Sequence, residues 1–392
     1  MAPEPFTVHV TDDVLADLQH RLSHIRWPDD VGNADWRYGA NRAYLEELVE
    51  YWRTGYDWRA QEERMNSYAH FRTVLDDPGG DVPIHFIHER GVGPAPVPLV
   101  LTHGWPWSFW DFEKVIRPLT DPAAYGGDPA DAFDVVVPSL PGFAFSTPLR
   151  RTGINFHRTA DLWVRLMRDE LGYDRFGAQG GDWGQLVTSQ LGHKYPQHLV
   201  GAHLSLSLPL DFFEAQLPAA ADYAEDERHW FHHTRARMEH ATSHIAVQST
   251  DPQNLAYAMH DSPVALLAWL VDRRRWWSDN TGDVEERFSR DDLITLTMLY
   301  WVGGFVGTAR FYWEAAHDLW RPSHDATPVV TAPTGVAVFP NELVVMPRVW
   351  MQRYYDLRRL TYMKSGGHFA PAEEPEALVE DVQEFFRPLR RA

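Results

Sequence analysis

An aspartate stands between small residues where a predicted strand is followed by a predicted helix. The segment reads Gly180-Gly181-Asp182-Trp183-Gly184. Its small residues suit a sharp strand-to-helix turn that exposes the central side chain, a position where many enzymes carry a serine nucleophile. An aspartate ordinarily has a pKa of about 3.9, so at neutral pH it is an anion that attacks carbon without a base and forms an ester. Asp182 is therefore a candidate nucleophile; the alternative is a glycine-rich turn with a helix-capping aspartate.

A second loop is expected at the same edge of the sheet. Residues 103–106, with the sequence HGWP, follow the predicted strand 99–102. We expect this loop to face the nucleophile, so that the backbone amides of Trp105 and Trp183 form an oxyanion hole. The alternative is a packed aromatic turn.

Two further loops carry a base and an acid. The loop 365–369, SGGHF, follows the last predicted strand and offers the imidazole of His368 as a general base. Glu342 follows the preceding strand and is the candidate acid partner of that histidine. The order Asp182, Glu342, His368 matches nucleophile, acid and base. The alternatives are a solvated loop histidine and a surface glutamate.

These loops need a sheet to position them. From residue 84 onward, short apolar runs alternate with helical segments, which predicts an α/β fold with a mainly parallel sheet and helices on both faces. The predicted strands cover residues 84–88, 99–102, 134–137, 176–179, 199–206, 336–339 and 360–364.

Two regions outside these strands have helical patterns. Apolar residues recur at helical spacing after Thr11-Asp12, which predicts an N-terminal helical arm over residues 1–83. Residues 209–333 form a second helical block, in which the sequence DSP at 261–263 opens a helix with proline at its first position. We therefore expect a helical cap inserted between two parts of the core, residues 84–208 and 334–392.

The composition excludes several classes of partner. Thirty-six Lys and Arg against 55 Asp and Glu give a net charge of −19, which disfavours nucleic acid and anionic lipid. No stretch approaches the roughly 20 apolar residues of a membrane span, and the first residues lack the pattern of a signal peptide. We expect a cytoplasmic protein.

Metal binding is not expected either. The chain has no cysteine, and His229 with His233, and His240 with His244, lie four apart without a recognisable set of acidic ligands. The run DRRRWW at 272–277 could touch a membrane, but cations are favourable at a helix C-terminus, so we expect a solvated helix end.

The chemical motifs together resemble a known family. The segments HGWP, GGDWG, FPNE and GGHFA, with RWPD at 26–29, YDWR at 56–59 and IHFIH at 84–88, are similar to the α/β-hydrolase-fold epoxide hydrolases of the microsomal type. The resemblance runs from about Phe6 to Pro388. It implies that Asp182 attacks an epoxide carbon, that His368 oriented by Glu342 activates water, and that Tyr312 is a cap tyrosine that hydrogen-bonds the leaving oxygen. It implies no cofactor.

The chain departs from that family at two positions predicted to bind substrate. His244 matches the second cap tyrosine, so an imidazole replaces one phenol, which puts the strength, pH range or regiochemistry of ring opening in question. Trp107 stands where the family usually has glycine, and we expect it to narrow the pocket.

The predicted function is hydrolysis of an apolar or aryl epoxide to a vicinal diol through an aspartyl ester. The partners are a small epoxide and water, and a homodimer is compatible with the sequence. Xenobiotic detoxification and the biosynthesis of secondary metabolites such as antibiotics both fit. The alternatives are a haloalkane dehalogenase, which also uses an aspartate followed by tryptophan, and a ligand-binding protein without turnover.

Overall fold

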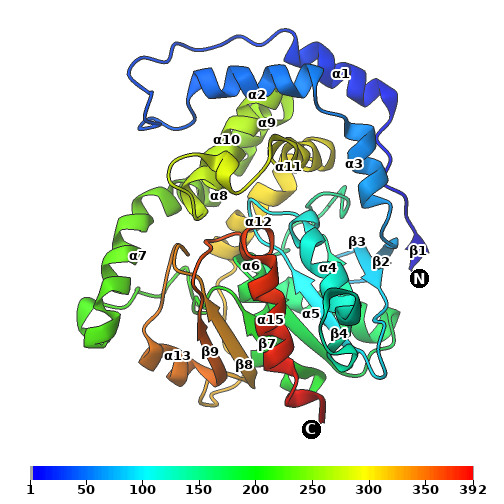
Figure 1. The fold of residues 1–392 in the computed structure, drawn as a ribbon, viewed down its shortest axis with the longest axis vertical. Helices are drawn as coiled ribbons and strands as arrows, with labels where there is room; N and C mark the ends of the chain where they lie inside the picture. Colours follow the sequence, from blue (N-terminus) through cyan, green and yellow to red (C-terminus); the bar gives the residue numbers. More distant parts are fainter. Residues whose placement is uncertain (1–2, 392) are drawn as a thin grey trace.

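The computed structural model describes residues 3–391 and contains one nine-stranded sheet with a helical cap above it (Figure 1). The strand order is β1-β2-β3-β5-β4-β6-β7-β8-β9. The strands are β1 (Glu4–Pro5), β2 (His70–Leu75), β3 (Val82–Glu89), β4 (Val97–Thr102), β5 (Phe133–Pro138), β6 (Phe176–Gly180), β7 (Leu199–Leu204), β8 (Val330–Val338) and β9 (Tyr355–Tyr362).

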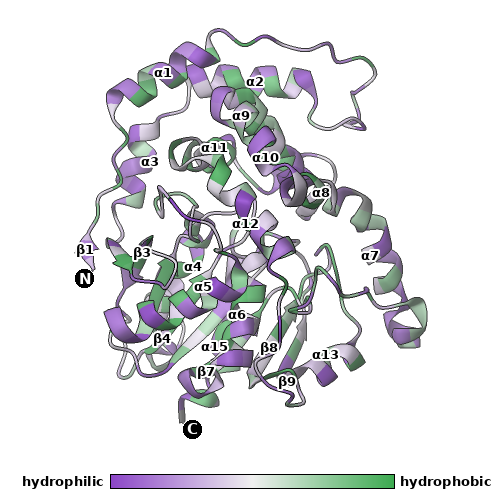
Figure 2. Ribbon diagram, turned by 180° about the vertical axis from the view of Figure 1, so that it is seen from behind, coloured by the Kyte–Doolittle hydropathy of each residue, from purple (hydrophilic) through white to green (hydrophobic). Residues whose placement is uncertain are grey.

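Helices of the core cover both faces of this sheet. Helix α4 (Glu113–Thr120) packs beside α15 (Pro375–Phe386), and α5 (Phe156–Val164) packs beside α6 (Trp183–Lys194), the two pairs lying on opposite faces (Figures 1 and 2). Because helices cover the sheet on each side, its central strands are apolar throughout, and all six residues of β5 are buried. The α/β-hydrolase fold expected from the sequence is confirmed.

The sheet is parallel from β5 to β9 and antiparallel at the other edge. Strands β5, β4, β6, β7, β8 and β9 pair in parallel, so the loops after β4, β6, β8 and β9 meet at one edge. Strand β2 pairs antiparallel with β3, from His70 opposite Ile87 to Leu75 opposite Val82. The loop 76–80 is therefore a hairpin connection.

The first 83 residues are not purely helical, contrary to our prediction. They contain α1 (Asp12–Leu22), α2 (Arg42–Thr54) and α3 (Trp58–Met65), but also β1 and β2, which extend the sheet. Sequence pattern alone missed β2 because its six residues include two charged or imidazole side chains and no clear alternation. Strand β8 also begins at Val330, inside the block 209–333 that we expected to be helical.

The cap lies between β7 and β8 and above the edge where the loops meet (Figure 1). It comprises α7 (Arg228–Ala241), α8 (Ser243–Thr250), α9 (Pro252–Asp261), α10 (Pro263–Trp277), α11 (Arg290–Gly303) and α12 (Phe305–His317). Helix α10 begins with Pro263 after Ser262, whose side chain accepts a hydrogen bond from the amide of Ala265. The short helices α13 (Arg348–Tyr354) and α14 (Ala370–Glu373) belong to the second part of the core.

The end of α10 is not solvated, so that expectation was wrong. Arg273 and Arg274 are only 6% and 3% exposed. Arg274 pairs with Asp111 of the core at 2.6 Å, and the guanidinium of Arg273 lies 3.6 Å from the centre of the Trp269 ring. The N-terminal helices α1 and α2 also pack against α10 (Figure 1).

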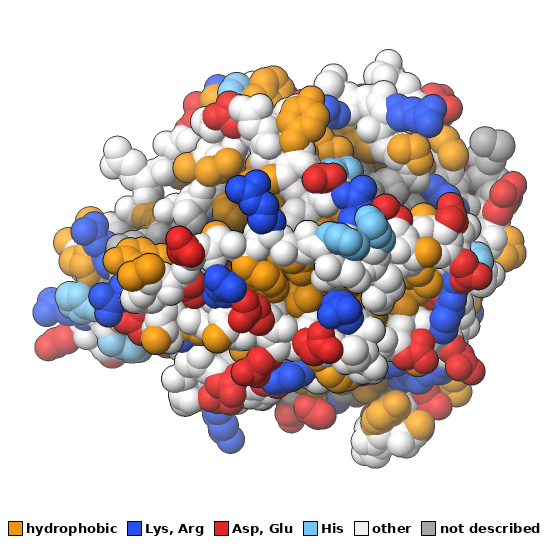
Figure 3. Space-filling model, turned by 90° about the horizontal axis from the view of Figure 1, so that it is seen from above, with side chains coloured by type: hydrophobic (Ala, Val, Ile, Leu, Met, Phe, Trp, Pro, Cys, Tyr) orange, Lys and Arg blue, Asp and Glu red, His pale blue; other side chains and the backbone are white. Residues whose placement is uncertain are grey.

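Apolar residues of the outer helices face inward. Helix α2, for example, buries Leu45, Leu48, Val49 and Trp52, while hydrophilic residues colour the outer side of α1 and α2 (Figure 2). Seen from above, the surface carries interspersed acidic and basic side chains with scattered apolar ones (Figure 3). No single helix within residues 3–391 is long and apolar enough to cross a membrane; α11 and α12 meet that test only as a pair, bent by 81°.

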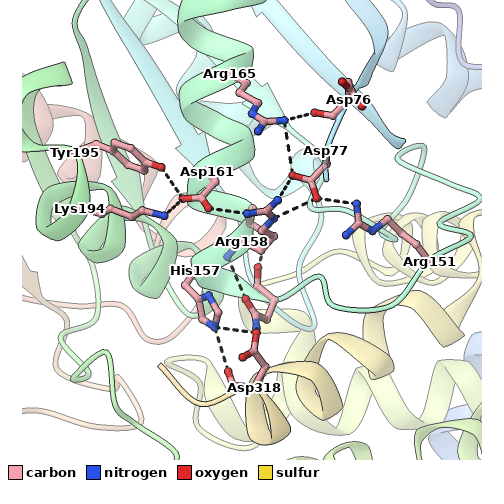
Figure 4. Close-up of polar contacts among 12 residues, drawn as sticks. Asp76, Asp77, Arg151, His157, Arg158, Asp161, Arg165, Lys194, Tyr195 and Asp318 are labelled. Atoms are coloured by element: carbon pink, nitrogen blue, oxygen red, sulfur yellow. Dashed lines mark hydrogen bonds and ion pairs between the residues drawn. The ribbon is translucent and has the colours of Figure 1, made fainter. Parts of the chain in front are cut away.

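An ion network around the buried side chain of Asp77 joins the hairpin to the core and the cap (Figure 4). The Asp77 side chain is fully buried and pairs with Arg151 at 2.7 Å and with Arg158 of α5. His157, the neighbour of Arg158, contacts the backbone oxygen of Asp318 at the end of α12 at 3.1 Å. The network therefore links the β2–β3 connection, α5 and the end of the cap.

Candidate active site

Asp182 occupies the sharp turn between β6 and α6. Its backbone has φ +51° and ψ −126°, a conformation in which a non-glycine residue is strained. The turn is possible only with small neighbours, since a Cβ atom on Gly184 would lie 1.8 Å from the carbonyl oxygen of Thr102, and one on Gly180 would lie 2.2 Å from that of Gly184. This geometry holds the carboxylate at the edge of the sheet, under the cap.

The two oxygens of the Asp182 carboxylate have different surroundings. Oδ1 accepts a hydrogen bond from the amide of Trp105 at 2.7 Å. Oδ2 lies 3.3 Å from Nε2 of His368. The amide of Trp183, the other predicted oxyanion-hole donor, begins α6 and donates to no acceptor within residues 3–391, so it is available to a second oxygen. One oxygen is thus held in place while the other is directed toward the base.

His103 fixes the loop that carries the Trp105 amide. Its Nε2 accepts a hydrogen bond from the amide of Leu140 at 3.0 Å, so Nδ1 carries the hydrogen and donates it to the oxygen of Gly104 at 2.9 Å. Burial lowers the pKa of His103 to about 4, which keeps the ring neutral at pH 7. Sequence reasoning gave His103 no role of its own, although its place at the end of an apolar strand was a usable signal.

His368 and Glu342 come together from the loops after β9 and β8. The Nδ1 atom of His368 lies 2.7 Å from Oε1 of Glu342, and that oxygen also accepts the amide of Leu343 at 2.6 Å. Burial alone would lower the pKa of His368, but the carboxylates of Glu342 and Asp182 outweigh burial and raise it to about 10. Without a substrate, the imidazole is therefore a cation between two anions.

The histidine loop is attached to the end of cap helix α10. The amide of His368 donates to the oxygen of Trp277 at 2.9 Å, and a Cβ on Gly367 would lie 2.8 Å from that oxygen. Glu373 accepts the amide of Phe369 through one oxygen and that of Asp279 through the other, at 2.8 and 2.7 Å. Burial raises the pKa of Glu373 to about 7.

Tyr312 and His244 meet above the carboxylate, although they are 68 residues apart. Nε2 of His244 lies 3.1 Å from the hydroxyl of Tyr312, and the imidazole stacks on Trp105 at 4.8 Å with 10° between the planes. Burial, and then the charge of Arg273, lower the pKa of His244 well below its usual value. Burial, and then the charge of Asp182, raise the pKa of Tyr312 well above 10. Both groups are neutral at pH 7.

A mostly apolar cavity of about 590 Å³, counting the part open to solvent, joins these groups. Its polar walls are Asp182, His368, Tyr312, His244 and Thr242. Sequence reasoning could not find the apolar walls, because they come from separate elements and look like ordinary core residues: Trp183, Leu186, Leu206, Leu208, Phe212, Met238, Ala241, Ile245, Trp277, Leu343 and Val344.

Trp107 does not narrow this cavity, so that prediction was wrong. The side chain is fully buried and is not part of the cavity wall. Its ring meets the imidazole of His368 edge-on at 5.5 Å between centroids and lies under Gly181, where a Cβ would come within 3.0 Å of it. Trp107 therefore supports the base and the turn from behind.

The histidines spaced by four along the cap serve separate contacts. His233 meets the backbone oxygen of Glu342 at 2.7 Å, His240 stacks on Trp276 at 3.9 Å, and His229 packs against Trp230. Residues 3–391 contain no group of three or more side chains placed to hold a metal ion.

Comparisons with known proteins find matching families and relatives along the chain. The family described as "Epoxide hydrolase N terminus" matches residues 3–112, and the family described as "alpha/beta hydrolase fold" matches residues 97–329. The chain is 34% identical to Epoxide hydrolase 1 of Sus scrofa, over 99% of this chain and 89% of that protein. Among solved structures, the Aspergillus niger epoxide hydrolase has a TM-score of 0.84 and 27% identity, covering 99% of this chain and 97% of that one. The juvenile hormone epoxide hydrolase of Bombyx mori has a TM-score of 0.85 and 25% identity, covering 100% and 95%.

Proposed function

The chain belongs to the epoxide hydrolases of the α/β-hydrolase fold, and we propose that it adds water to its substrate through a covalent ester on Asp182. The observation that carries this proposal is the asymmetry of the Asp182 carboxylate, with Oδ1 bound to the Trp105 amide and Oδ2 beside His368 in the cavity. One oxygen is placed to attack, and the other is placed to carry the charge of a later intermediate.

In the first step, Oδ2 of Asp182 forms a bond to an epoxide carbon. The bond between that carbon and the ring oxygen breaks, and its electron pair stays on the oxygen. The phenol of Tyr312 donates its proton to this oxygen, which it can do at pH 7 because the high pKa of Tyr312 keeps the phenol protonated. The products are an ester on Asp182 and a phenolate on Tyr312.

In the second step, water cleaves the ester. Ester formation removes the negative charge of Asp182, so the pKa of His368 falls and its extra proton passes through water to the Tyr312 phenolate. The neutral ring, held by Glu342, is then a base. It takes a proton from water, and the oxygen of that water attacks Cγ of Asp182. The charge that forms on Oδ1 is stabilised by the Trp105 amide. His368 then protonates the leaving oxygen of the diol, and the proton released by the new carboxyl group returns to His368, which restores the cation of the resting enzyme.

The cavity supports an apolar or aryl epoxide as substrate. Its walls are mainly leucine, valine and aromatic side chains, and none of its charged groups is placed to pair with a charged substituent apart from the catalytic ones. Such a substrate is compatible with detoxification of foreign compounds and with tailoring of a secondary metabolite. A panel of styrene-type and aliphatic oxiranes, assayed for diol formation, would rank these classes.

A single turnover in heavy-oxygen water tests the ester. Excess enzyme should place the label in the Asp182 carboxylate, because water attacks Cγ and the diol leaves with an oxygen from the enzyme. The variant His368→Gln should accumulate the ester, seen as a mass increase equal to that of the substrate. Label found only in the diol, with none in Asp182, would refute the proposal.

A further inference from the structure

A buried arginine lies behind the pair of Tyr312 and His244. Arg273 of α10 is 6% exposed, and its terminal nitrogens donate to the oxygen of Trp269 at 3.0 Å and to the hydroxyl of Ser243 at 3.4 Å. Ser243 directly precedes His244 in α8, so Arg273 is hydrogen-bonded to the residue next to the imidazole. Its charge lowers the pKa of both His244 and Tyr312, although burial is the largest influence on each.

In the hydrogen bond between Nε2 of His244 and the hydroxyl of Tyr312, either group can be the donor. If Nε2 is bare, it accepts the phenol hydrogen and competes with the substrate for it. If Nε2 carries the hydrogen, it donates to the phenol oxygen and leaves the phenol hydrogen for the substrate. Only the second arrangement helps ring opening.

Arg273 favours the second arrangement. In a neutral imidazole with hydrogen on Nε2, the lone pair is on Nδ1, the ring nitrogen nearer to the backbone. Nδ1 of His244 is buried and has no hydrogen-bond partner within residues 3–391. Arginine has only donor groups and is always charged, so the nearby guanidinium, whose charge lowers the pKa of His244, favours a lone pair on the unpartnered Nδ1 and disfavours a second proton. The Nε atom of Arg273 is likewise buried without a partner.

We propose that Arg273 holds His244 as the neutral tautomer with hydrogen on Nε2, and that this hydrogen stabilises the Tyr312 oxygen while the phenol protonates the leaving oxygen of the epoxide. His244 is then a catalytic residue, because it contacts a reacting atom, and Arg273 is a positioning residue. The inference rests on the proposed function, in which Tyr312 is the proton donor. Neither His244 nor Arg273 gives up a proton: the Tyr312 oxygen keeps the electron pair of its O–H bond and accepts a hydrogen bond from Nε2.

Variants at His244 test the donor. Ester formation and ester hydrolysis are measured separately in single turnovers with styrene oxide, by acid quench and protein mass. His244→Phe should slow ester formation by about 100-fold, as expected for loss of one donor to a developing oxyanion, and leave the hydrolysis of the ester within threefold of wild type. His244→Gln, whose amide N–H can replace the donor, should recover at least tenfold of that loss.

Variants at Arg273 test the positioning. Arg273→Met should slow ester formation by about tenfold, and Arg273→Lys, which keeps the charge, should stay within threefold of wild type. Arg275→Met is the matched control on the same helix, because Arg275 is half-buried against Trp36 and donates to the oxygen of Gly282. It should react like the unchanged enzyme.

The tautomer of His244 can also be observed directly in the wild-type enzyme, where no substitution can disturb the fold. Nitrogen-15 NMR of histidine-labelled wild-type enzyme, with His244 assigned by its absence in His244→Gln, should show a protonated Nε2 and a bare Nδ1. A bare Nε2 overturns the inference, as does ester formation in His244→Phe as fast as in His244→Gln. Failure of the proposed function is a separate result, because wild-type enzyme would then form no ester at all.

Discussion

Gly104 lies against the nucleophile, and replacing it with alanine should displace the carboxylate. A Cβ atom at this position would lie 2.2 Å from Oδ1 and 2.3 Å from Cβ of Asp182. Ordinary contacts between such atoms exceed 3 Å, so either the loop or the aspartate must move by about 1 Å. The move also breaks or lengthens the 2.7 Å hydrogen bond from the Trp105 amide to Oδ1.

The expected loss of rate follows from this displacement. A misplacement of about 1 Å in reacting groups reduces rates by about 10², and loss of an oxyanion donor reduces them by about 10² to 10³. We therefore expect Gly104→Ala to lower the rate of ester formation by about 10² and the rate of ester hydrolysis by at least as much. Both rates are measured in single turnovers with quench and mass analysis.

The control must show that crowding alone does not cause the effect. Gly127→Ala is suitable, because its Cβ would come within 3.2 Å of Pro122, in a surface turn far from the cavity. It should react at the wild-type rate. If Gly104→Ala is folded, as judged by circular dichroism and thermal unfolding, and forms the ester within threefold of the wild-type rate, the described placement of Asp182 is refuted.

Three further variants test the rest of the site and the fold. Glu342→Gln should slow ester hydrolysis by about 10³ while ester formation changes less than tenfold, and the acid limb of hydrolysis should move to lower pH because His368 loses the charge that raises its pKa. Asp381→Asn should lower the free energy of unfolding by about 3 kcal/mol in urea at pH 7 without slowing ester formation. Burial would raise the pKa of Asp381, but its hydrogen bond from His203 and other partners lower it to about 2, so this stabilisation is complete above the ordinary value of 3.8 and is lost as the pH falls toward 2. Asp77→Asn should lower the free energy of unfolding by a similar amount, and an unchanged urea midpoint would show that the ion network around Asp77 (Figure 4) does not stabilise the fold.

The sequence was sufficient to predict a mainly parallel sheet with helices on both faces and to predict the chemical groups. Loops after parallel strands must meet at one edge, so Asp182, Glu342 and His368 could be expected together before any coordinates. The extent of the N-terminal arm could not be predicted, because β2 is recognisable as a strand only through its pairing with β3. Pairing is a tertiary property that a short polar run does not reveal.

The sequence also could not predict which charged side chains are buried. Arg273 and Arg275 are two residues apart in one run, and nothing in their types distinguishes the inward cation from the outward one. The difference depends on which side of α10 faces the core. The prediction for Trp107 was wrong for a related reason: its position directly after the HGWP segment suggested the cavity, but its ring packs against the imidazole of His368 outside the cavity wall.

The attachment of the histidine loop to α10 has a consequence for engineering. Because the amides of His368 and Asp279 and the oxygen of Trp277 are hydrogen-bonded across the boundary between cap and core, the two parts share one backbone framework. A chimera that receives its cap from a relative will lose or distort these hydrogen bonds unless residues 365–373 are taken from the same relative. To transfer a relative's substrate range, the cap and that loop should therefore be exchanged together. Libraries that recombine the cap and the loop independently should contain mostly inactive variants.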